Sequence, residues 1–474
     1  MSVARPLAAS LLLLLLAPTA ALAQAAAAQQ EVSDQKASTE ADGIPKRSIA
    51  NDLPEKGDPH GVRKALAQRG ITFDALYTGE VMSAVAGGLR RGSVYGGQLE
   101  MSLTAKLDQY GLPGLSVFSN GFQLHQTKGL SRTFVGNLNA ISDIEALPAT
   151  RLSELWLQQS LFGGKVSLRV GQLAADTEFT GATFSLPFVS SDWPALLRND
   201  LPGTGPAYPL ATPGVRLKLD PDRQNSLLLA LFNGDPAGRG ADPEIRNRTG
   251  TNFRTRDPAL LMAEYQHRYN QEDEDKGLAG ALKLGAWYHL GRFDHQRVDD
   301  MRLSLASDAS SGMAARLRGN GGVYGVIDQQ LYRPEGGKAD DGIGVFTRLF
   351  LAPSDRNPIA FFVDGGVVAS GLVPQRPDDK IGFSALYSHL GKQAGGLDRD
   401  YAVPAGLYRP VSHSELSLEG TYVAQIRTGW TLQPTVTRVI RPDGGRVQVD
   451  QVSGAIRPRL KDATVLGLRT TILY

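Results

Sequence analysis

The sequence predicts an all-β fold, a 16-stranded antiparallel transmembrane β-barrel in which one long loop folds back into the interior. Three observations predict it. The chain begins with an export signal, runs of alternating apolar and polar residues recur from about residue 71 onward, and the last of these runs ends on the final residue, Tyr474.

Residues 1–23 have the three parts of a secretory signal peptide. Arg5 supplies a positive charge, Leu11–Leu16 form an unbroken apolar run, and residues 21–23 give a small-x-small cleavage site. The apolar run is too short for a retained spanning helix. We therefore expect an exported protein that begins at Gln24.

The composition excludes several classes of protein. Beyond the signal peptide, charges, glycines or prolines interrupt every apolar run before it reaches the roughly 20 residues of a spanning helix. The chain has no cysteine, so no disulfide framework stabilises it. The 53 glycines and 27 prolines are scattered, which suits turns between many strands, and 50 Lys and Arg against 48 Asp and Glu leave no basic stripe for nucleic acid. An exported chain of this kind is either soluble or a closed barrel.

A leader over residues 24–70 precedes the expected barrel of residues 71–474. Residues 24–58 are rich in Ala and Gln and then polar, with no period that would bury a face, so we expect a mobile periplasmic segment. A brief helical pattern from Val62 to Gln68 predicts one short helix before the barrel.

The clearest barrel strand is predicted at residues 98–107, where Leu99 and Met101 lie on one face and Gln98 and Glu100 on the other. Similar alternation occurs at residues 153–161, 165–173, 259–267, 281–289 and 415–424, with weaker runs near 71, 115, 213, 225, 321, 342, 358, 380, 430 and the C-terminus. The total of 16 strands suits a single-chain barrel that is wide enough to enclose water.

The run from Thr464 to Tyr474 favours a membrane barrel over a soluble one. Alternation alone does not separate the two, because an apolar face can meet either a protein core or lipid. Leu466 and Leu468 share a face with the terminal aromatic residue, which fits the interfacial girdle of a transmembrane barrel. Together with the export signal, this run predicts an outer-membrane protein of a Gram-negative bacterium.

Two intervals are too long for simple turns. The interval from Asp176 to Pro213 contains many prolines and glycines together with several aromatic residues, and we expect it to fold into the lumen and form a constriction. The interval from Arg292 to Asn320 is rich in Ser, Ala and Asp, and we expect a surface loop there.

Several composite motifs, in order along the chain, resemble those of the OprB-type carbohydrate-selective porins. The matching stretches are residues 78–81 (TGEV), 87–92 (GGLRRG), 144–148 (IEALP), 171–176 (GQLAAD), 193–196 (WPAL), 205–210 (GPAYPL), 232–236 (FNGDP), 352–357 (APSDRN) and 466–471 (LGLRTT). The resemblance runs from about Gly70 to Tyr474, and the leader at residues 24–58 is not part of it.

This resemblance implies a barrel through which glucose and related sugars diffuse passively into the periplasm. The implied partners are small sugars, together with outer-membrane lipid and lipopolysaccharide around the barrel. Neither the resemblance nor the residues decide between a monomer and a homo-oligomer, and they do not indicate which sugar is preferred. No cofactor is implied.

The candidate functional residues are those that could set the width, hydration and electric field at the narrowest point of a channel. Sugar hydroxyls need groups that donate and accept hydrogen bonds, and the apolar face of a sugar favours an aromatic ring. The candidates are Arg90, Arg91, Glu100, Glu154, Trp156, Arg169, Asp192, Trp193, Arg198 and Trp287.

These candidates come from three places. Five of them fall on the polar face of predicted strands, where most side chains only keep the wall wet. Arg90 and Arg91 lie between glycines and would face solute only if their hairpin bends inward. Asp192, Trp193 and Arg198 belong to the long loop and are the preferred constriction residues; alternatively, they pin that loop to the wall.

Catalytic and metal-binding patterns are weak. Glu415 and Glu419 share a face of one strand but lie about 13 Å apart along it, which is too far for a glycosidase pair. The seven histidines show no metal-ligand spacing. Two rival functions remain open at this point: a general porin without sugar preference, and a secreted β-rich protein that binds or cleaves glycans.

Overall fold

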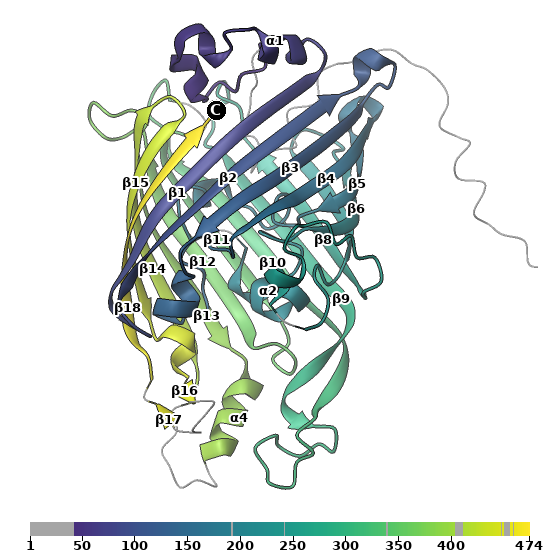
Figure 1. Ribbon diagram of the computed structural model, residues 1–474, viewed down its shortest axis with the longest axis vertical. Helices are drawn as coiled ribbons and strands as arrows, with labels where there is room; N and C mark the ends of the chain where they lie inside the picture. The colour runs from purple at the N-terminus through teal and green to yellow at the C-terminus, as the bar shows by residue number, and fades with distance from the viewer. Residues whose placement is uncertain are drawn as a thin grey trace, which may run out of the picture.

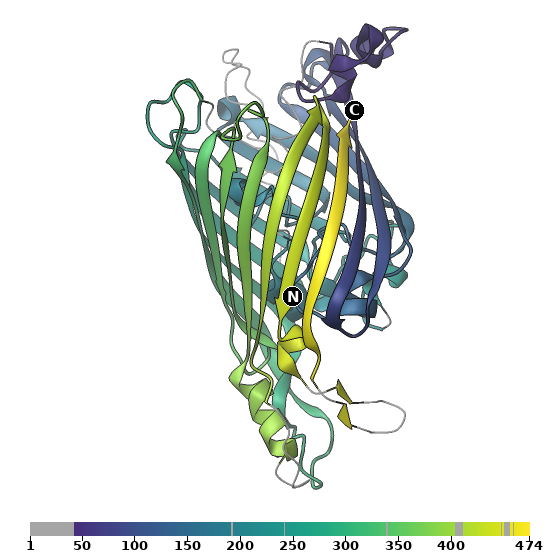
Figure 2. The ribbon, with the colours of Figure 1, turned by 90° about the vertical axis from the view of Figure 1, so that its left-hand side faces the viewer.

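The computed structural model describes residues 42–190, 193–240, 242–337, 340–402, 411–446, 448–449, 456–457 and 459–474. In this part of the chain, 16 strands close into one antiparallel barrel, as the sequence predicts (Figures 1 and 2). The barrel strands are β1 Ile71–Gly88, β2 Gly92–Lys106, β3 Leu115–Gln126, β4 Ala149–Leu161, β5 Val166–Leu173, β6 Thr212–Leu219, β7 Asn225–Asn233, β8 Ala259–Tyr269, β9 Gly280–Asp299, β10 Ala314–Tyr332, β11 Gly342–Leu351, β12 Ile359–Ser370, β13 Lys380–Leu390, β14 Ser414–Arg427, β15 Trp430–Ile440 and β18 Lys461–Leu473.

Each barrel strand pairs with the next strand of the barrel along the chain, and β18 closes the ring between β15 and β1. At this seam, the contact between β1 and β18, Leu76 lies opposite Leu473 and Glu80 lies opposite Arg469. The two strands β16 (Gln448–Val449) and β17 (Ile456–Arg457) form a separate small sheet in the connection between β15 and β18. The described helices outside the strands are α1 Val62–Ala67, α2 Ala195–Asp200, α3 Pro243–Arg246 and α4 Lys392–Ala402.

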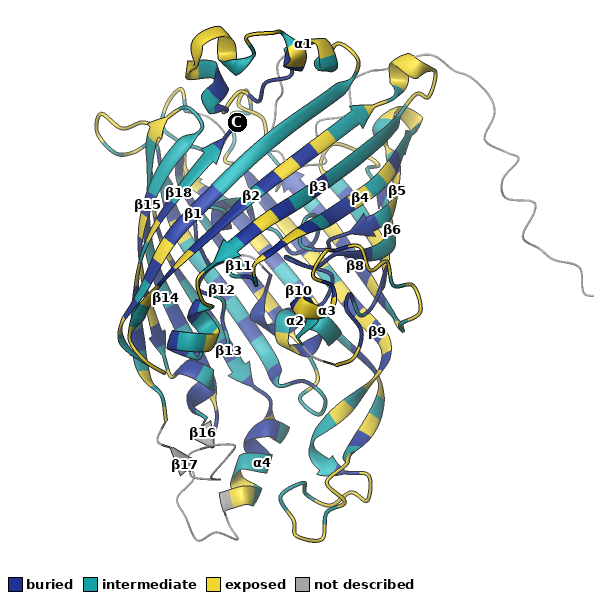
Figure 3. Ribbon diagram, viewed as in Figure 1, coloured by how far each residue is buried: buried dark blue, intermediate teal, exposed yellow. Residues whose placement is uncertain are grey.

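The burial pattern of the strands is inverted relative to a soluble protein. Met101 is 61% exposed and Leu468 is 48% exposed on the outer surface, whereas Glu264 is fully buried inside. Buried and exposed residues alternate along the strands in Figure 3. Apolar residues outside and polar residues inside are the arrangement of a barrel in lipid, so the structure decides the question that alternation left open.

No helix among the described residues is long and apolar enough to cross a membrane, a finding that does not bear on β-barrels.

The two ends of the barrel differ in the length of their connections. The longer connections all lie at one end and comprise residues 127–148, 174–211, 234–258, 300–313, 391–413 and 441–460. The opposite end has shorter turns, and both the described start of the chain and Tyr474 lie there (Figure 1). We call these the long-loop end and the short-turn end.

From residue 42 onward the leader is folded against the short-turn end, where the sequence led us to expect a mobile segment. Short 3₁₀ turns follow at Ile49–Asp52 and Pro54–Gly57, and Ile44 and Ala50 are buried. The predicted short helix is present as α1. The sequence missed this packing because a few isolated apolar residues in a polar stretch show neither a helical nor a strand period. The expected signal peptide lies outside the described residues.

The expected surface loop at residues 292–320 is instead largely a hairpin. β9 continues to Asp299 and β10 starts at Ala314, so only residues 300–313 form the loop. Arg316 pairs with Asp294 across this hairpin, and the end of the hairpin extends beyond the barrel (Figure 1). Water can reach both faces of such an extension, so its strands lack the alternation on which the prediction depended.

Candidate functional site

Two loops enter the lumen, and we number them in chain order. The second inward loop, residues 174–211 between β5 and β6, folds into the lumen as predicted. Carboxylates on the inner wall hold its backbone by accepting N–H hydrogen bonds. The pairs are Ala174 N to Glu154 at 3.1 Å, Thr180 N to Glu264 at 2.8 Å, Phe184 N to Asp328 at 3.0 Å and Val189 N to Glu419 at 2.8 Å. Four wall strands therefore fix the path of this loop, because hydrogen bonds to charged acceptors are the stronger kind.

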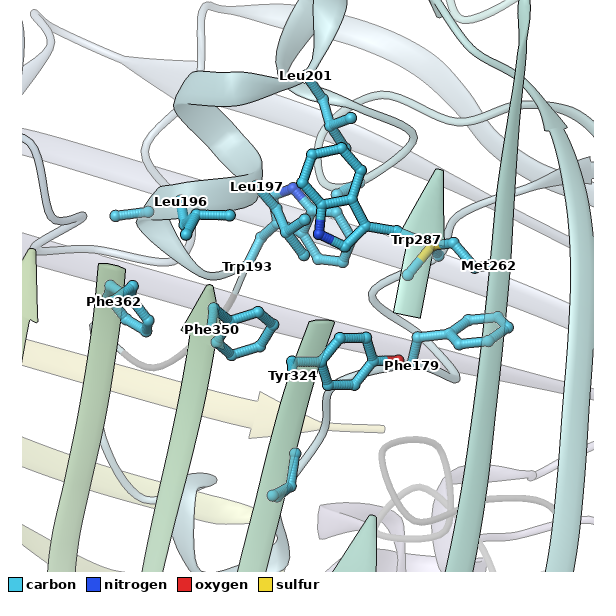
Figure 4. Packing of buried hydrophobic residues seen from close by; sticks show 14 of the residues in the cluster. Phe179, Trp193, Leu196, Leu197, Leu201, Met262, Trp287, Tyr324, Phe350 and Phe362 are labelled. Atoms are coloured by element: carbon cyan, nitrogen blue, oxygen red, sulfur yellow. The ribbon is translucent and has the colours of Figure 1, made fainter. Parts of the chain in front are cut away.

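Aromatic and aliphatic side chains pack this loop against one side of the barrel (Figure 4). Trp193, Leu196 and Leu197 of the loop face Met262, Trp287, Tyr324, Phe350 and Phe362, which come from β8, β9, β10, β11 and β12. Trp193 and Trp287 are both almost fully buried in this cluster. The cluster therefore fills that side of the lumen.

A first inward loop, residues 127–148 between β3 and β4, also enters the lumen, and the sequence analysis did not predict this. Leu130, Phe134 and Val135 belong to a buried cluster that includes Met82 of β1 and Val439 of β15. This loop packs on the opposite side of the barrel from the aromatic cluster, since β1 and β15 adjoin the seam.

One wall carboxylate holds the backbone of the first inward loop in the same way as four hold the second. Glu415 of β14 accepts hydrogen bonds from the N–H of Leu138, at 2.8 and 2.9 Å, and from the N–H of Asn139 at 2.7 Å. Glu415 and Glu419 are therefore neighbours on the wall that each secure a different loop.

A pocket lies where the two loops meet, and we call it the loop-junction pocket. Ala140 and Asp143 line it from the first inward loop; Trp193, Arg198, Thr204 and Tyr208 line it from the second. The loops touch beside it, because the N–H of Asp143 donates to the carbonyl of Val189 at 2.9 Å and the Tyr208 hydroxyl donates to the carbonyl of Ile144 at 3.1 Å.

The loop-junction pocket offers opposite charges and aromatic surface. The Asp143 side chain is 31% exposed, and the Arg198 side chain from the other loop is half-buried. The indole N–H of Trp193 is satisfied by the carbonyl of Thr204 at 3.1 Å, which leaves its ring as an apolar wall. The pocket itself has room for about one water molecule, so its lining groups can act on a solute that passes beside it and not on one enclosed in it.

The ten sequence candidates fall into separate groups. Trp193 and Arg198 line the loop-junction pocket. Trp287 faces the lumen, as alternation predicted, but it packs in the aromatic cluster and does not line the pocket. Asp192 lies outside the described residues.

Trp156 and Arg169 lie together on the inner wall at another place. The Arg169 guanidinium stacks on the Trp156 ring at 3.7 Å, and the Phe118 ring stacks on Trp156 at 4.8 Å. Arg169 also pairs with Glu178 of the second inward loop at 3.4 Å. This stack secures the beginning of that loop.

Four candidates lie away from the pocket. Glu100 accepts a hydrogen bond from the Asn120 amide at 3.0 Å, and Glu154 holds the start of the second inward loop. Arg90 and Arg91 are exposed in the β1–β2 turn at the long-loop end. The Arg90 guanidinium lies 4.8 Å from the centre of the Phe134 ring, so its hairpin contacts the first inward loop at the rim.

Asp143 and Tyr208 are pocket residues that sequence reasoning missed. Two signals could have found them: the long interval between the strands at 115–126 and 149–161, and the stretches IEALP and GPAYPL, which carry the family resemblance but belong to no strand.

Comparison with known proteins decides the family. The model of the family described as carbohydrate-selective porin, OprB family, matches residues 90–474. The chain belongs to the OprB family. Porin B of Pseudomonas aeruginosa is 24% identical over 441 residues, which cover 86% of this chain and 90% of that protein.

Solved structures agree on the fold of this OprB-family chain. The high-pH structure of Pseudomonas putida OprB superposes with a TM-score of 0.74 at 18% identity, covering 88% of this chain and 98% of that one. The low-pH structure of the same protein gives a TM-score of 0.50 at 15% identity, with 88% and 97% covered.

The chain is thus a carbohydrate-selective porin of the Gram-negative outer membrane. Such barrels carry short turns in the periplasm and longer loops outside the cell. The short-turn end with the leader and Tyr474 therefore faces the periplasm, and the two inward loops descend from the extracellular side. Among the described residues, no cluster of three or more His, Asp or Glu side chains could hold a metal ion.

Proposed function

We propose that glucose and related sugars diffuse passively through this porin, and that the loop-junction pocket is its constriction. The observation that supports the proposal is the meeting of two independently anchored loops, with Asp143 on one side and Trp193, Arg198 and Tyr208 on the other. We infer these constriction residues from the geometry of this chain and not from its membership of the family.

The chemistry of this pocket suits an uncharged polyol. The Asp143 carboxylate accepts from sugar hydroxyls, the Arg198 guanidinium donates to them, and the half-buried Tyr208 ring offers a surface for the apolar face of the sugar. Each such hydrogen bond to a charged group contributes only about 1.5 kcal/mol net, so a sugar is held briefly and then released. Weak binding at one narrow point favours sugars without blocking their passage.

The proposal includes no bond-breaking step. The carboxylates that could act as acids or bases on the inner wall, such as Glu415, Glu419 and Glu264, are occupied by N–H groups of the two loops. They serve to hold the loops in place, which is consistent with a passive channel.

Planar-bilayer recordings with the purified porin test this function. We expect glucose added to one side to reduce the single-channel current in a concentration-dependent way. We expect Asp143→Asn and Arg198→Gln each to weaken that block about tenfold, the loss that corresponds to one hydrogen bond to a charged group. Lys165→Ala is the matched control, because Lys165 is exposed in the β4–β5 turn at the periplasmic end.

Two outcomes would contradict the proposal. If no sugar reduces the current of the wild-type channel, the porin lacks sugar preference and acts as a general channel. If sugars block but the pocket variants behave like Lys165→Ala, the constriction lies elsewhere in the lumen.

The remaining sequence assignments extend this proposal. Residues 1–23 act as a cleaved signal peptide and residues 24–70 as a periplasmic leader, which the intact mass of the purified protein would test by its first residue, Gln24. The apolar outer surface contacts lipid and, in the outer leaflet, lipopolysaccharide. Any further copies of the chain would cover part of the same surface, and light scattering of the purified porin would detect them.

A further inference from the structure

A buried ion pair joins the first and last strands of the barrel. Glu80 of β1 lies directly opposite Arg469 of β18 in the seam register. The Nε and Nη2 groups of Arg469 both donate to Oε2 of Glu80, at 3.0 and 2.7 Å. Glu80 is 3% exposed and Arg469 is 6% exposed, so the pair is shielded from bulk water. Both side chains point into the lumen, on the polar face of their strands.

The same pair extends to the first inward loop. Nη2 of Arg469 donates to Oδ1 of Asp143 at 2.5 Å and approaches Oγ of Ser142 at 3.4 Å. The Ser142 hydroxyl donates to the second carboxylate oxygen of Glu80 at 2.5 Å. The pocket residue Asp143 is therefore held by a guanidinium that is itself oriented by a carboxylate across the seam.

We propose that Glu80 and Arg469 are positioning residues for sugar selection, and that the constriction is completed only when β1 and β18 have paired. This inference rests on the proposed function of the loop-junction pocket. Arg469 alone can contact Asp143, but its guanidinium is fixed in direction by Glu80 on the other strand. In a barrel with an open seam, Glu80 would no longer orient Arg469, and Asp143 would lose its fixed donor.

The charges around this group explain why the arrangement needs the arginine. Glu80 and Asp143 are two carboxylates that share the guanidinium of Arg469. If that guanidinium is removed, their negative charges repel each other. Arg198 is the cation among the residues that line the pocket, so it is the alternative partner that the pocket offers to Asp143. Without Arg469, Asp143 would swing toward Arg198 and narrow or close the site for sugar.

The rest of the first inward loop does not depend on this contact. Glu415 holds the backbone of Leu138 and Asn139, and Phe134 and Val135 are buried in their own cluster. A change at Arg469 should therefore displace residues near Asp143 while the loop and the barrel remain folded.

A double-mutant cycle in planar bilayers tests the proposal. We expect Arg469→Gln to weaken glucose block about tenfold, like Asp143→Asn, and the double variant to be no weaker than either single variant, because both remove the same contact. Arg469→Lys keeps the charge but loses the planar guanidinium, whose two nitrogens reach Glu80 and Asp143 together, and should restore part of the block. Arg469→Gln should also make the channel more cation-selective, measured as a shift in reversal potential under a salt gradient.

Arg438→Gln is the matched control. Arg438 is an arginine of the neighbouring strand β15 that pairs with Asp462 at 3.5 Å, and both side chains of that pair are at least 40% exposed. The Arg438→Gln variant removes an arginine near the seam without changing the loop-junction pocket, so we expect the sugar block and ion selectivity of the wild-type channel. Folding of every variant is checked by heat-dependent gel mobility.

The outcomes separate the two proposals. If Asp143→Asn leaves sugar block unchanged, the proposed constriction is wrong. If Asp143→Asn weakens block but Arg469→Gln does not, or if the two losses multiply in the double variant, the positioning role is wrong. Should Arg469→Gln fail to fold, Ser142→Ala takes its place, because it leaves the seam pair intact. We expect about threefold weaker block, since it removes the hydrogen bond from Ser142 to Glu80 and acts on Asp143 only indirectly; wild-type block would overturn the proposal.

Discussion

Arg216 shows how single residues hold the lumen in shape. It is fully buried, and its guanidinium donates to Glu178 of the second inward loop at 2.7 and 2.8 Å and to Gln158 at 3.0 Å. Arg169 lies directly opposite it in the β5–β6 register and shares Glu178. Two arginines thus secure one loop carboxylate, an arrangement that serves the position of the loop and not contact with solute.

Replacing Arg216 should destabilise the protein strongly. We expect Arg216→Met to lower the free energy of unfolding by about 3–5 kcal/mol, because the buried carboxylate of Glu178 then loses one of the two guanidinium groups that balance its charge. Urea unfolding in lipid vesicles measures this change. Lys165→Met is the control, since that lysine is exposed, and equal losses for both variants would contradict the role given to Arg216.

The pH dependence of that effect follows from Glu178, which lies on the loop and not on a strand. Burial alone would raise its pKa, but Arg169 and Arg216 outweigh burial and hold the pKa at about 2, below its ordinary 4.5. A lowered folded-state pKa adds stability above the unfolded pKa and loses it as the pH falls toward the folded one. We expect the difference between wild type and Arg216→Met to be constant above about pH 5.5 and to shrink between pH 4.5 and 2. A difference that instead grows on acidification would contradict this assignment.

Residue-level reasoning from sequence succeeded where alternation decides and failed where tertiary contact decides. Trp156 and Trp287 do face the lumen, because period two fixes the face of a strand residue. Alternation carries no information about which loop covers a wall residue. Trp287 is consequently a packing residue, while Asp143 lay in a loop that no period marked.

At the scale of elements, the leader is joined to the seam from the periplasmic side. Arg63 of α1 is buried between the rings of Phe73 and Tyr474, with its guanidinium 4.5 and 5.0 Å from their centres. It also donates to the carbonyl of Tyr474 at 3.3 Å, and the Tyr474 hydroxyl donates to the carbonyl of Gly57 at 2.6 Å. The leader, which precedes both strands in the sequence, therefore contacts the first strand at Phe73 and the residue after the last strand, Tyr474.

Removing the contacts of Arg63 should weaken the seam. We expect Arg63→Ala to lower the free energy of unfolding by about 2–3 kcal/mol through the lost ring contacts and charged hydrogen bonds. The neighbouring Lys64→Ala should change it by less than about 0.5 kcal/mol, because Lys64 is exposed on the same helix. Urea unfolding compares the two, and limited proteolysis should cut the leader faster in Arg63→Ala. Indistinguishable variants would mean that the leader adds nothing to the seam.

At the scale of the whole molecule, the lumen is narrowed from two sides. The second inward loop fills the side of β8 to β12 with an aromatic cluster, and the first inward loop packs near β1 and β15. The strand count and the longer loop were predictable because lipid imposes alternation on every strand and because a long aromatic interval stands out. The first inward loop was not predictable in this way, since residues 127–148 form a shorter interval with one aromatic residue, Phe134.

This arrangement predicts how removal of the second inward loop changes conduction. Replacing residues 177–207 by a short Gly-Ser linker should still give a closed barrel, because strand register depends on the wall, and the wall carboxylates then become hydrated at little cost. We expect the single-channel conductance to rise several-fold and glucose block to disappear, because conduction past a constriction depends on its width and on the groups that line it. Removal of residues 302–311 at the tip of the β9–β10 hairpin is the control and should leave both unchanged, since that loop projects beyond the barrel (Figure 1). An unchanged conductance in the first variant would show that the permeation path does not run beside the second inward loop.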